Sequence, residues 1–124
     1  MKAIIIDDSR VMRTILKKLL AAEGFTALLE AGDGAEAILR LKEAGRVDLA
    51  LVDWNMPRMN GLEFVTALRE DHAFDGVRVM MVTTESEITQ VARALEAGAN
   101  EYVMKPFTPE ILRDKLGILG LRAA

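Results

Sequence analysis

Short apolar runs alternate with amphipathic segments along the whole chain, and this alternation restricts the possible folds more than any other feature. The amphipathic segments have helical spacing, as where Val11, Ile15 and Leu19 recur every four residues. Neighbouring parallel strands need crossover connections, and helices in these connections cover both faces of the sheet. We therefore expect a doubly wound α/β fold, with five parallel strands and five helices. The expected strands are residues 3–6, 27–30, 49–52, 77–82 and 101–104, and the expected helices are about 11–24, 35–44, 62–70, 87–97 and 109–119.

Length, charge and cysteine content narrow the functional classes. A chain of 124 residues with 51% hydrophobic and 28% charged residues fits one globular domain, and we expect a single domain over 1–124 with no attached DNA-binding or enzymatic domain. The net charge of −3 and the lack of a long basic cluster argue against direct nucleic-acid binding. The absence of cysteine excludes disulfides and thiolate metal sites. The first residues form neither a signal peptide nor a membrane span, so we expect a cytoplasmic protein.

Polar residues follow the expected strands at the edge where such folds bind ligands. In an open α/β sheet, ligands bind beyond the carboxyl ends of the strands, near the point where strand order reverses. We therefore expect three carboxylates, two hydroxyls and one ammonium group to meet at one edge of the sheet. They belong to Asp7 and Asp8 after the first strand, Asp53 after the third, Thr83 and Thr84 after the fourth, and Lys105 after the fifth.

Such a group of side chains is suited to phosphoryl chemistry with a metal ion. Crowded carboxylates repel one another and resist ionisation unless a cation compensates their charge. Oxygen ligands without histidine or cysteine favour Mg²⁺. A carboxylate can accept a phosphoryl group as an aspartyl phosphate, while the metal and Lys105 neutralise charge and Thr83 donates a hydrogen bond.

Four segments of the chain resemble the signatures of receiver domains of two-component response regulators, in the order of that family. They are IIDDSR, LALVDWNMPRMNG, VMMVTTES and NEYVMKPF. The similarity is greatest to stand-alone chemotaxis (CheY-like) regulators, in which Asp-Trp-Asn-Met-Pro is a familiar form of the acceptor motif. The resemblance implies a flavodoxin-like sheet with the strand order 2-1-3-4-5 known for chemotaxis regulators.

The resemblance also implies a role for each acidic residue. Asp53 would be the phosphoacceptor, with a histidine kinase as the phosphodonor. Asp8, Asp53 and the main-chain carbonyl of Asn55 would bind Mg²⁺ directly, and Asp7 would act mostly through a water molecule. Beyond its own phosphorylation and dephosphorylation, the protein would not be an enzyme.

Three further residues would connect phosphorylation to a change in conformation. By resemblance, Lys105 pairs with the acceptor carboxylate or its phosphate, ahead of a cis bond to Pro106. Thr83 would swing toward the phosphoryl group, and Tyr102 would turn inward into the space that Thr83 vacates. Phosphate contacts would come from Thr84, Asn55 and Lys105.

Output would come from binding another protein, because only Gly120 and the segment Leu121-Arg-Ala-Ala follow the last expected helix. The expected docking face comprises the fourth helix, the fifth strand and the fifth helix, and a flagellar-switch protein is one candidate partner. Ile88, Val91 and Leu95 form an apolar stripe at helical spacing, which either packs in the core or docks the partner. In the second case, Ala92 and Ala94 would supply the buried side. A phosphatase is a further possible partner, and we expect a monomer.

Four residues refine these expectations, two that differ from the common family sequence and two that match it. Asn60 stands where the family often has aspartate, and we expect no loss of phosphorylation from it. Ile88 stands near a position where similar chemotaxis regulators commonly have lysine, so the partner's identity stays open. Asn55 and Glu85 match residues of fast-resetting regulators, which implies brisk self-dephosphorylation.

Several candidate residues also have a purely structural interpretation. Asp8 or Ser9 could cap the first helix. Asp53 could begin a turn, and Lys105 could be an ordinary exposed lysine. Tyr102 could be a packing residue.

Other functions remain alternatives. A phosphorelay intermediate or phosphate sink would have the same sequence features. An aspartyl-phosphate phosphatase related to haloacid dehalogenases would place its nucleophile after the first strand and would carry a cap domain. A flavin-binding module is disfavoured, because Asp7 and Asp8 would repel a phosphate without a metal.

Overall fold

The computed structural model describes residues 1–121, so residues 122–124 of the expected domain lie outside the described part. A five-stranded parallel sheet with the order β2-β1-β3-β4-β5 forms the centre of the molecule. This order confirms the fold expected from the sequence. The strands are β1 (Lys2–Ile6), β2 (Ala27–Ala31), β3 (Leu49–Asp53), β4 (Arg78–Thr83) and β5 (Glu101–Met104).

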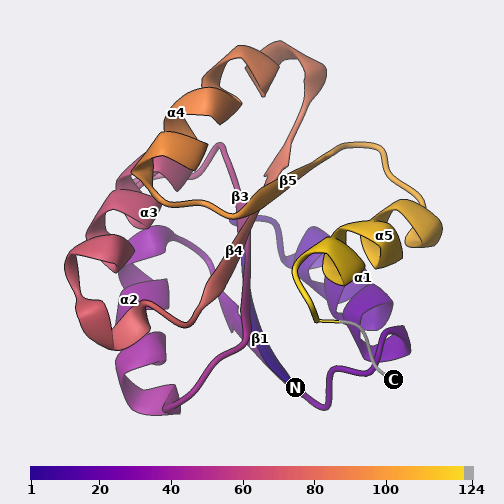
Figure 1. Cartoon of the computed structure of the whole chain (residues 1–124), viewed down its shortest axis with the longest axis horizontal. Coiled ribbons are helices and arrows are strands. Elements are labelled where there is room, and N and C mark those ends of the chain that lie inside the picture. Colours follow the sequence, from indigo (N-terminus) through magenta and orange to yellow (C-terminus); the bar gives the residue numbers. More distant parts are fainter. Residues whose placement is uncertain (122–124) are drawn as a thin grey trace.

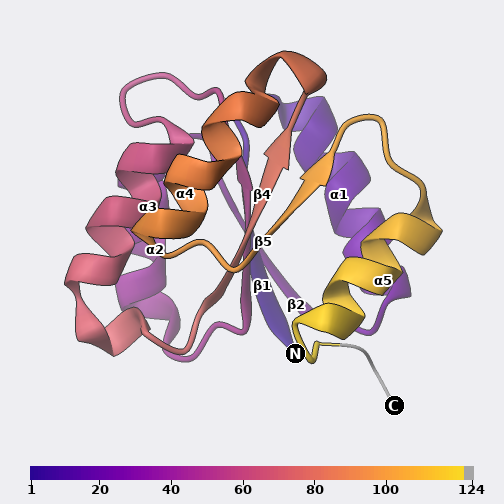
Figure 2. The ribbon, with the colours of Figure 1, turned by 45° about the horizontal axis from the view of Figure 1, so that its top comes forward.

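Helices cover both faces of the sheet, and residues 1–121 contain five α-helices. One face carries α1 (Arg10–Ala22) and α5 (Pro109–Ile118). The other face carries α2 (Gly34–Ala44), α3 (Gly61–Glu70) and α4 (Val91–Ala97), as Figures 1 and 2 show from two directions. No helix within residues 1–121 is long and apolar enough to cross a membrane.

Alternate strand residues divide the apolar side chains between two cores, because successive side chains of a strand point to opposite faces. In β1, Ile5 points toward α1 and α5, whereas Ile4 points toward the three other helices. The core under α1 and α5 contains Ala3, Ile5, Leu16, Leu20, Phe25, Leu49, Leu51, Met80, Val82, Val103, Leu112 and Leu116. Both cores hold the strands rigidly, and the strand ends are therefore well-defined positions for functional side chains.

The fourth helix differs from the expected span of 87–97. A 3₁₀ segment, η2 (Glu85–Gln90), comes first, and α4 begins only at Val91. The Glu87 carboxylate accepts hydrogen bonds from both the backbone N–H and the hydroxyl of Thr84, at 3.0 Å each. The Glu87 N–H also donates to the Thr84 carbonyl at 3.0 Å, and this backbone bond between residues three apart is the 3₁₀ pattern. A shorter 3₁₀ segment, η1 (His72–Phe74), follows α3.

The apolar stripe of the fourth helix is split between core and surface. Val91 and Ala94 are buried, Ile88 is half-buried, and Leu95 is 40% exposed. Ala92 is exposed rather than buried. Neither expected arrangement therefore describes the whole stripe, because Val91 and Leu95 differ in exposure although both belong to α4.

Two polar residues cap the helices that follow β1 and β3. The Ser9 hydroxyl accepts the Met12 N–H at 3.3 Å, so Ser9 rather than Asp8 caps α1. The Asn60 side chain accepts the Glu63 N–H at 2.9 Å, and the Glu63 carboxylate accepts the Asn60 N–H at 3.1 Å. This reciprocal pair is a capping box that begins α3.

Replacing Asn60 with alanine is expected to lower the free energy of unfolding by about 1 kcal/mol, because the N–H groups at the start of α3 lose their acceptor. Asn60→Asp keeps an acceptor of the same length and is expected to unfold like the wild type. Urea unfolding of the three proteins measures both effects. Equal loss in both variants would contradict a capping role.

Candidate functional site

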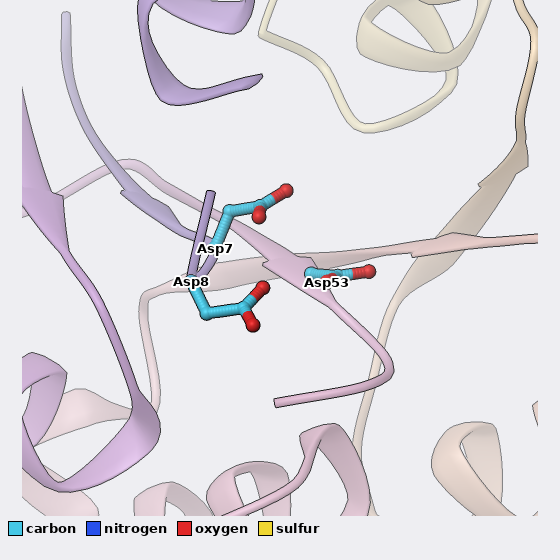
Figure 3. A group of neighbouring side chains, drawn as sticks. All are labelled: Asp7, Asp8 and Asp53. Carbon is cyan, nitrogen blue, oxygen red and sulfur yellow. The ribbon is translucent and has the colours of Figure 1, made fainter. Parts of the chain in front are cut away.

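Three carboxylates lie together at the carboxyl ends of the two central strands. Ile6 and Val52 are paired in register, so the residues that follow them, Asp7 and Asp53, reach the same level. Ligand oxygens of Asp7, Asp8 and Asp53 all lie within 4.8 Å of one another. Figure 3 shows Asp7 and Asp8 extending from the end of β1 beside Asp53 at the end of β3.

Asp7 is a buried carboxylate with one oxygen left unsatisfied. Its side chain accepts the Ser9 N–H through Oδ1 at 2.8 Å. Asp7 is only 2% exposed, and Oδ2 has no hydrogen-bond partner among the described residues. Burial raises the pKa of Asp7, and the Ser9 N–H and Lys105 only partly offset this effect. A buried acceptor without a donor is costly, and a bound cation or water would remove the cost.

Asp53 is the carboxylate whose ionisation is most hindered. Its side chain is 11% exposed, and Oδ1 lies 3.4 Å from the Lys105 ammonium group. Burial raises the pKa of Asp53 to about 6. The negative charge of Asp7 also raises this pKa, whereas the positive charge of Lys105 lowers it. Lys105 alone therefore compensates the negative charge of the Asp53 carboxylate only in part.

The donor set fits a hard divalent cation. All three side chains offer oxygen ligands. Asp7 and Asp53 are shielded from solvent, whereas Asp8 is exposed. Small carboxylate clusters of this kind suit Mg²⁺, which binds one or two carboxylates and keeps several waters. The unsatisfied Oδ2 of Asp7 and the hindered ionisation of Asp53 both point to such an ion.

Lys105 reaches the cluster from the end of β5. Its backbone N–H donates to the Thr83 carbonyl at 2.7 Å, which extends the pairing of β4 and β5 by one bond. The bond from Lys105 to Pro106 is cis, as the family resemblance implies. Lys105 is therefore not an ordinary exposed lysine, since its side chain is 26% exposed and paired with Asp53.

The two threonines at the end of β4 have different surroundings. Thr83 is fully buried, and its hydroxyl has no hydrogen-bond partner among residues 1–121. The Thr84 hydroxyl contacts Glu87 and Ser86, each at 3.0 Å. The buried Thr83 hydroxyl at the end of β4 is thus without a hydrogen-bond partner, whereas the Thr84 hydroxyl is hydrogen-bonded to residues of η2.

Comparison with known proteins places this arrangement in a family. Residues 3–117 match the family model described as response regulator receiver domain. The chain belongs to the receiver-domain family. This receiver domain is 42% identical over 119 residues to "Chemotaxis protein CheY1" of Helicobacter pylori, a match that covers 96% of each chain. It is 44% identical over 121 residues to "Chemotaxis protein CheY homolog" of Campylobacter jejuni, covering 97% of this chain and 93% of the relative.

A solved structure agrees with the fold of the receiver domain. Chemotaxis protein CheY4 of Vibrio cholerae superimposes with a TM-score of 0.85 at 33% identity, covering 95% of this chain and 97% of that one. The family resemblance seen in the four sequence segments is confirmed.

Tyr102 of the receiver domain is half-buried on β5 and packs against the core formed with α2, α3 and α4. The Lys115 ammonium group lies 4.6 Å from the centre of its ring, a cation–π arrangement. Lys115 also donates to Glu101 at 3.1 Å, and the same Glu101 oxygen accepts the Tyr102 N–H at 2.9 Å. Tyr102 therefore lies where β5 meets α5.

The remaining predicted residues lie in loops around the cluster. Asn55 is exposed directly beyond Trp54, which is buried at 6% exposure, and Glu85 is exposed at the start of η2. The structure brings the three predicted carboxylates together, with oxygens of Asp7, Asp8 and Asp53 within 4.8 Å of one another. It also places the predicted Lys105 ammonium group 3.4 Å from Asp53. The roles assigned to Asn55, Glu85 and Tyr102 stay predictions.

Sequence reasoning missed one residue that positions the cluster. Arg13 on α1 donates to the Asp7 carbonyl at 2.6 Å and to the Glu30 carboxylate at 3.0 Å. It thereby ties the segment with Asp7 and Asp8 to the end of β2. Its position one turn into a helix gave no distinguishing signal, because exposed helix faces commonly carry arginine.

Proposed function

We propose that this receiver domain accepts a phosphoryl group on Asp53 from the phosphohistidine of a histidine kinase and signals by binding another protein. The observation that carries the proposal is the partly buried Asp53 carboxylate, which adjoins both Lys105 and the Asp7–Asp8 pair. A single lysine and a carboxylate cluster match what phosphoryl transfer to an aspartate requires. Similarity to chemotaxis proteins supports a role in chemotaxis.

In the proposed reaction, an oxygen of Asp53 bonds to phosphorus while the bond from phosphorus to the donor imidazole nitrogen breaks. The electron pair of that bond stays on the nitrogen, which takes up a proton. Asp8, Asp53 and the Asn55 carbonyl would hold Mg²⁺ directly and Asp7 would hold it through water, and the bound ion would supply positive charge for the transferring oxygens. Lys105 stabilises the same charge from the other side. Asn55 contributes a further phosphate contact, and Thr84 contributes another once its N–H or hydroxyl is released from Glu87.

The proposed switch uses the free hydroxyl of Thr83. Thr83 donates to a phosphoryl oxygen, and Tyr102 moves inward beside it. The buried, unpaired hydroxyl supports this role, because it gains a partner only when an acceptor arrives. The new Tyr102 position changes the surface formed by α4, β5 and α5, to which the partner protein binds. A flagellar-switch protein is the candidate partner.

The proposal includes the setting of the domain. The protein acts in the cytoplasm as a monomeric response regulator, without direct nucleic-acid or membrane binding. A dedicated phosphatase is a possible further partner. Apart from its own phosphorylation and dephosphorylation, it is not an enzyme.

The test is phosphorylation by acetyl phosphate with Mg²⁺, followed by intact-mass measurement. Wild-type protein is expected to gain one phosphoryl group, and the gain is expected to disappear in Asp53→Asn and in excess chelator. Asp114→Asn, which removes an exposed carboxylate of α5, is the matched control and should be labelled normally. Stoichiometric phosphorylation of the Asp53→Asn variant would contradict the proposal.

A further inference from the structure

The loop between β3 and α3 carries Asn55, and its tip is fastened to the beginning of α2. We propose that Arg58 and Asp33 are positioning residues that hold this loop, and with it the Asn55 carbonyl, in the geometry that binds the divalent cation. The inference rests on the proposed cation site. It adds a residue pair that lies outside the carboxylate cluster and, among residues 1–121, forms no hydrogen bond or ion pair with the three carboxylates.

Asp33 joins two segments of the chain through its two oxygens. Oδ1 accepts the Glu36 N–H at 2.8 Å and thereby caps α2. Oδ2 accepts hydrogen bonds from Nε of Arg58, at 3.0 Å, and from Nη2 of the same guanidinium group. The Asp33 side chain is 3% exposed, whereas the Arg58 side chain is 77% exposed. A buried, fully bonded carboxylate therefore anchors a long side chain that reaches in from the loop.

The backbone of Arg58 is held in a conformation that arginine rarely adopts. Its φ is +65°, and it is the only non-glycine residue within 1–121 with a positive φ. Such a conformation costs free energy for a residue with a Cβ atom and persists where surrounding contacts impose it. The Met59 N–H donates to the Pro57 carbonyl at 2.6 Å and closes a tight turn around Arg58, and the charged contact with Asp33, which uses two donors, adds a second constraint.

Packing at Met59 fastens the same tip. The Met59 side chain lies so close to Gly34 that a Cβ on Gly34 would lie 2.8 Å from both its Cγ and its Sδ. The loop tip therefore lies directly on the first residue of α2. Both neighbouring residues of the tip, Arg58 and Met59, make contacts with Asp33 and Gly34 respectively.

The base of the loop is fastened separately. The Gly61 N–H donates to the Trp54 carbonyl at 3.0 Å, and the Trp54 N–H donates to the Val82 carbonyl at 3.1 Å. Asn55 lies between this base and the tip at Arg58. Loss of the tip contact would free the Asn55 main chain, while the carboxylates on the strand ends would keep their positions.

Arg58→Gly tests the inference most directly. Glycine adopts a positive φ without strain, so this variant removes the guanidinium group while favouring the same backbone. Loss of one positive charge near the cluster would by itself strengthen Mg²⁺ binding. We expect the opposite, a roughly tenfold weaker Mg²⁺ affinity, as is typical when a residue that orients a metal ligand is lost.

Three more variants and a control make the test more specific. Asp33→Asn keeps a good N-cap for α2 but loses the charged acceptor, and its Mg²⁺ affinity is expected to fall about as far as that of Arg58→Gly. The double variant should be no weaker than either single one, because the two residues act through one contact. Arg58→Lys should recover part of the affinity. The control is Arg46→Gly, which removes an equal charge from an exposed pair with Asp48 elsewhere on the molecule.

Mg²⁺ affinity is measured by titration of Trp54 fluorescence and, independently, by the Mg²⁺-dependent rise in melting temperature. Circular dichroism checks that each variant is folded, and Asp33→Asn replaces Arg58→Gly if the latter does not fold. If wild-type protein binds Mg²⁺ and both variants bind it as tightly, the positioning role is overturned while the cation site stands. If wild-type protein itself binds no Mg²⁺, both the site and the positioning role are overturned.

Discussion

Replacing Asp53 with asparagine is expected to stabilise the metal-free domain by about 2 kcal/mol at about pH 8. The reason is the raised pKa of Asp53, about 6 in the folded chain against an ordinary value of 3.8. An ionised carboxylate that is 11% exposed and beside Asp7 opposes folding, and the neutral amide removes that opposition. Lys105 loses its partner in the variant, which offsets part of the gain.

The pH dependence of this gain follows from the direction of the shift. Between about pH 4 and 6, the folded wild type holds a proton on Asp53 that the unfolded chain has released. Wild-type stability therefore falls as pH rises through this window, and the penalty is complete above about pH 6. The advantage of Asp53→Asn should be near zero below about pH 4 and should grow across the same window.

Urea unfolding in the presence of a chelator, repeated across this pH range, measures the difference. Asp114→Asn serves as a control, since it removes an exposed carboxylate from α5. Added Mg²⁺ should stabilise the wild type and not the Asp53 variant, which reverses their order at sufficient concentration. A wild type that is the more stable protein without metal at about pH 8 would contradict the expected electrostatics.

Gly61→Ala is expected to lower the free energy of unfolding by about 2–3 kcal/mol. A Cβ at this position would lie 2.6 Å from Cε of Met81 and 3.2 Å from Cα of Trp54. It would also lie 3.3 Å from the carbonyl oxygen of Asp53. The end of the Met81 side chain can move, but the two backbone contacts belong to the segment that carries Asp53, the proposed phosphoacceptor.

The same substitution should slow phosphorylation by acetyl phosphate roughly tenfold, because a small displacement of the acceptor disturbs its alignment. Gly76→Ala is the matched control, since a Cβ at Gly76 meets nothing within 4 Å and its φ is ordinary. Urea unfolding and the initial rate of mass increase measure the two effects. Equal behaviour of the two alanine variants would show that the close approach at Gly61 is unimportant.

The sheet and its functional edge could be predicted because both depend on short-range pattern. Continuous apolar runs such as that around Leu51 indicate strands buried on both faces. Their parallel arrangement then determines that Asp7, Asp53 and Lys105 lie at one edge, although they are far apart in the sequence. The strand limits differ from expectation by about one residue at several ends, as is usual for element boundaries.

Features that depend on particular long-range contacts could not be predicted in this way. The contact between Asp33 and Arg58 joins residues 25 positions apart, and no spacing rule pairs them. The fourth helix is divided because its first part has backbone bonds between residues three apart, such as that from the Glu87 N–H to the Thr84 carbonyl at 3.0 Å. Helical periodicity alone therefore placed Ile88 and Leu95 on one stripe that the folded chain divides.

The two separate cores have a consequence for how such a domain can diverge. α4 and α5 cover opposite faces of the sheet, so a partner bound across α4, β5 and α5 contacts surfaces supported by different sets of buried residues. Substitutions in either set can reshape that surface, while Asp53 and its neighbours remain on the central strands β1 and β3. Duplicated copies of the gene can therefore acquire new partners by gradual change in the outer layers and retain an unaltered reaction centre.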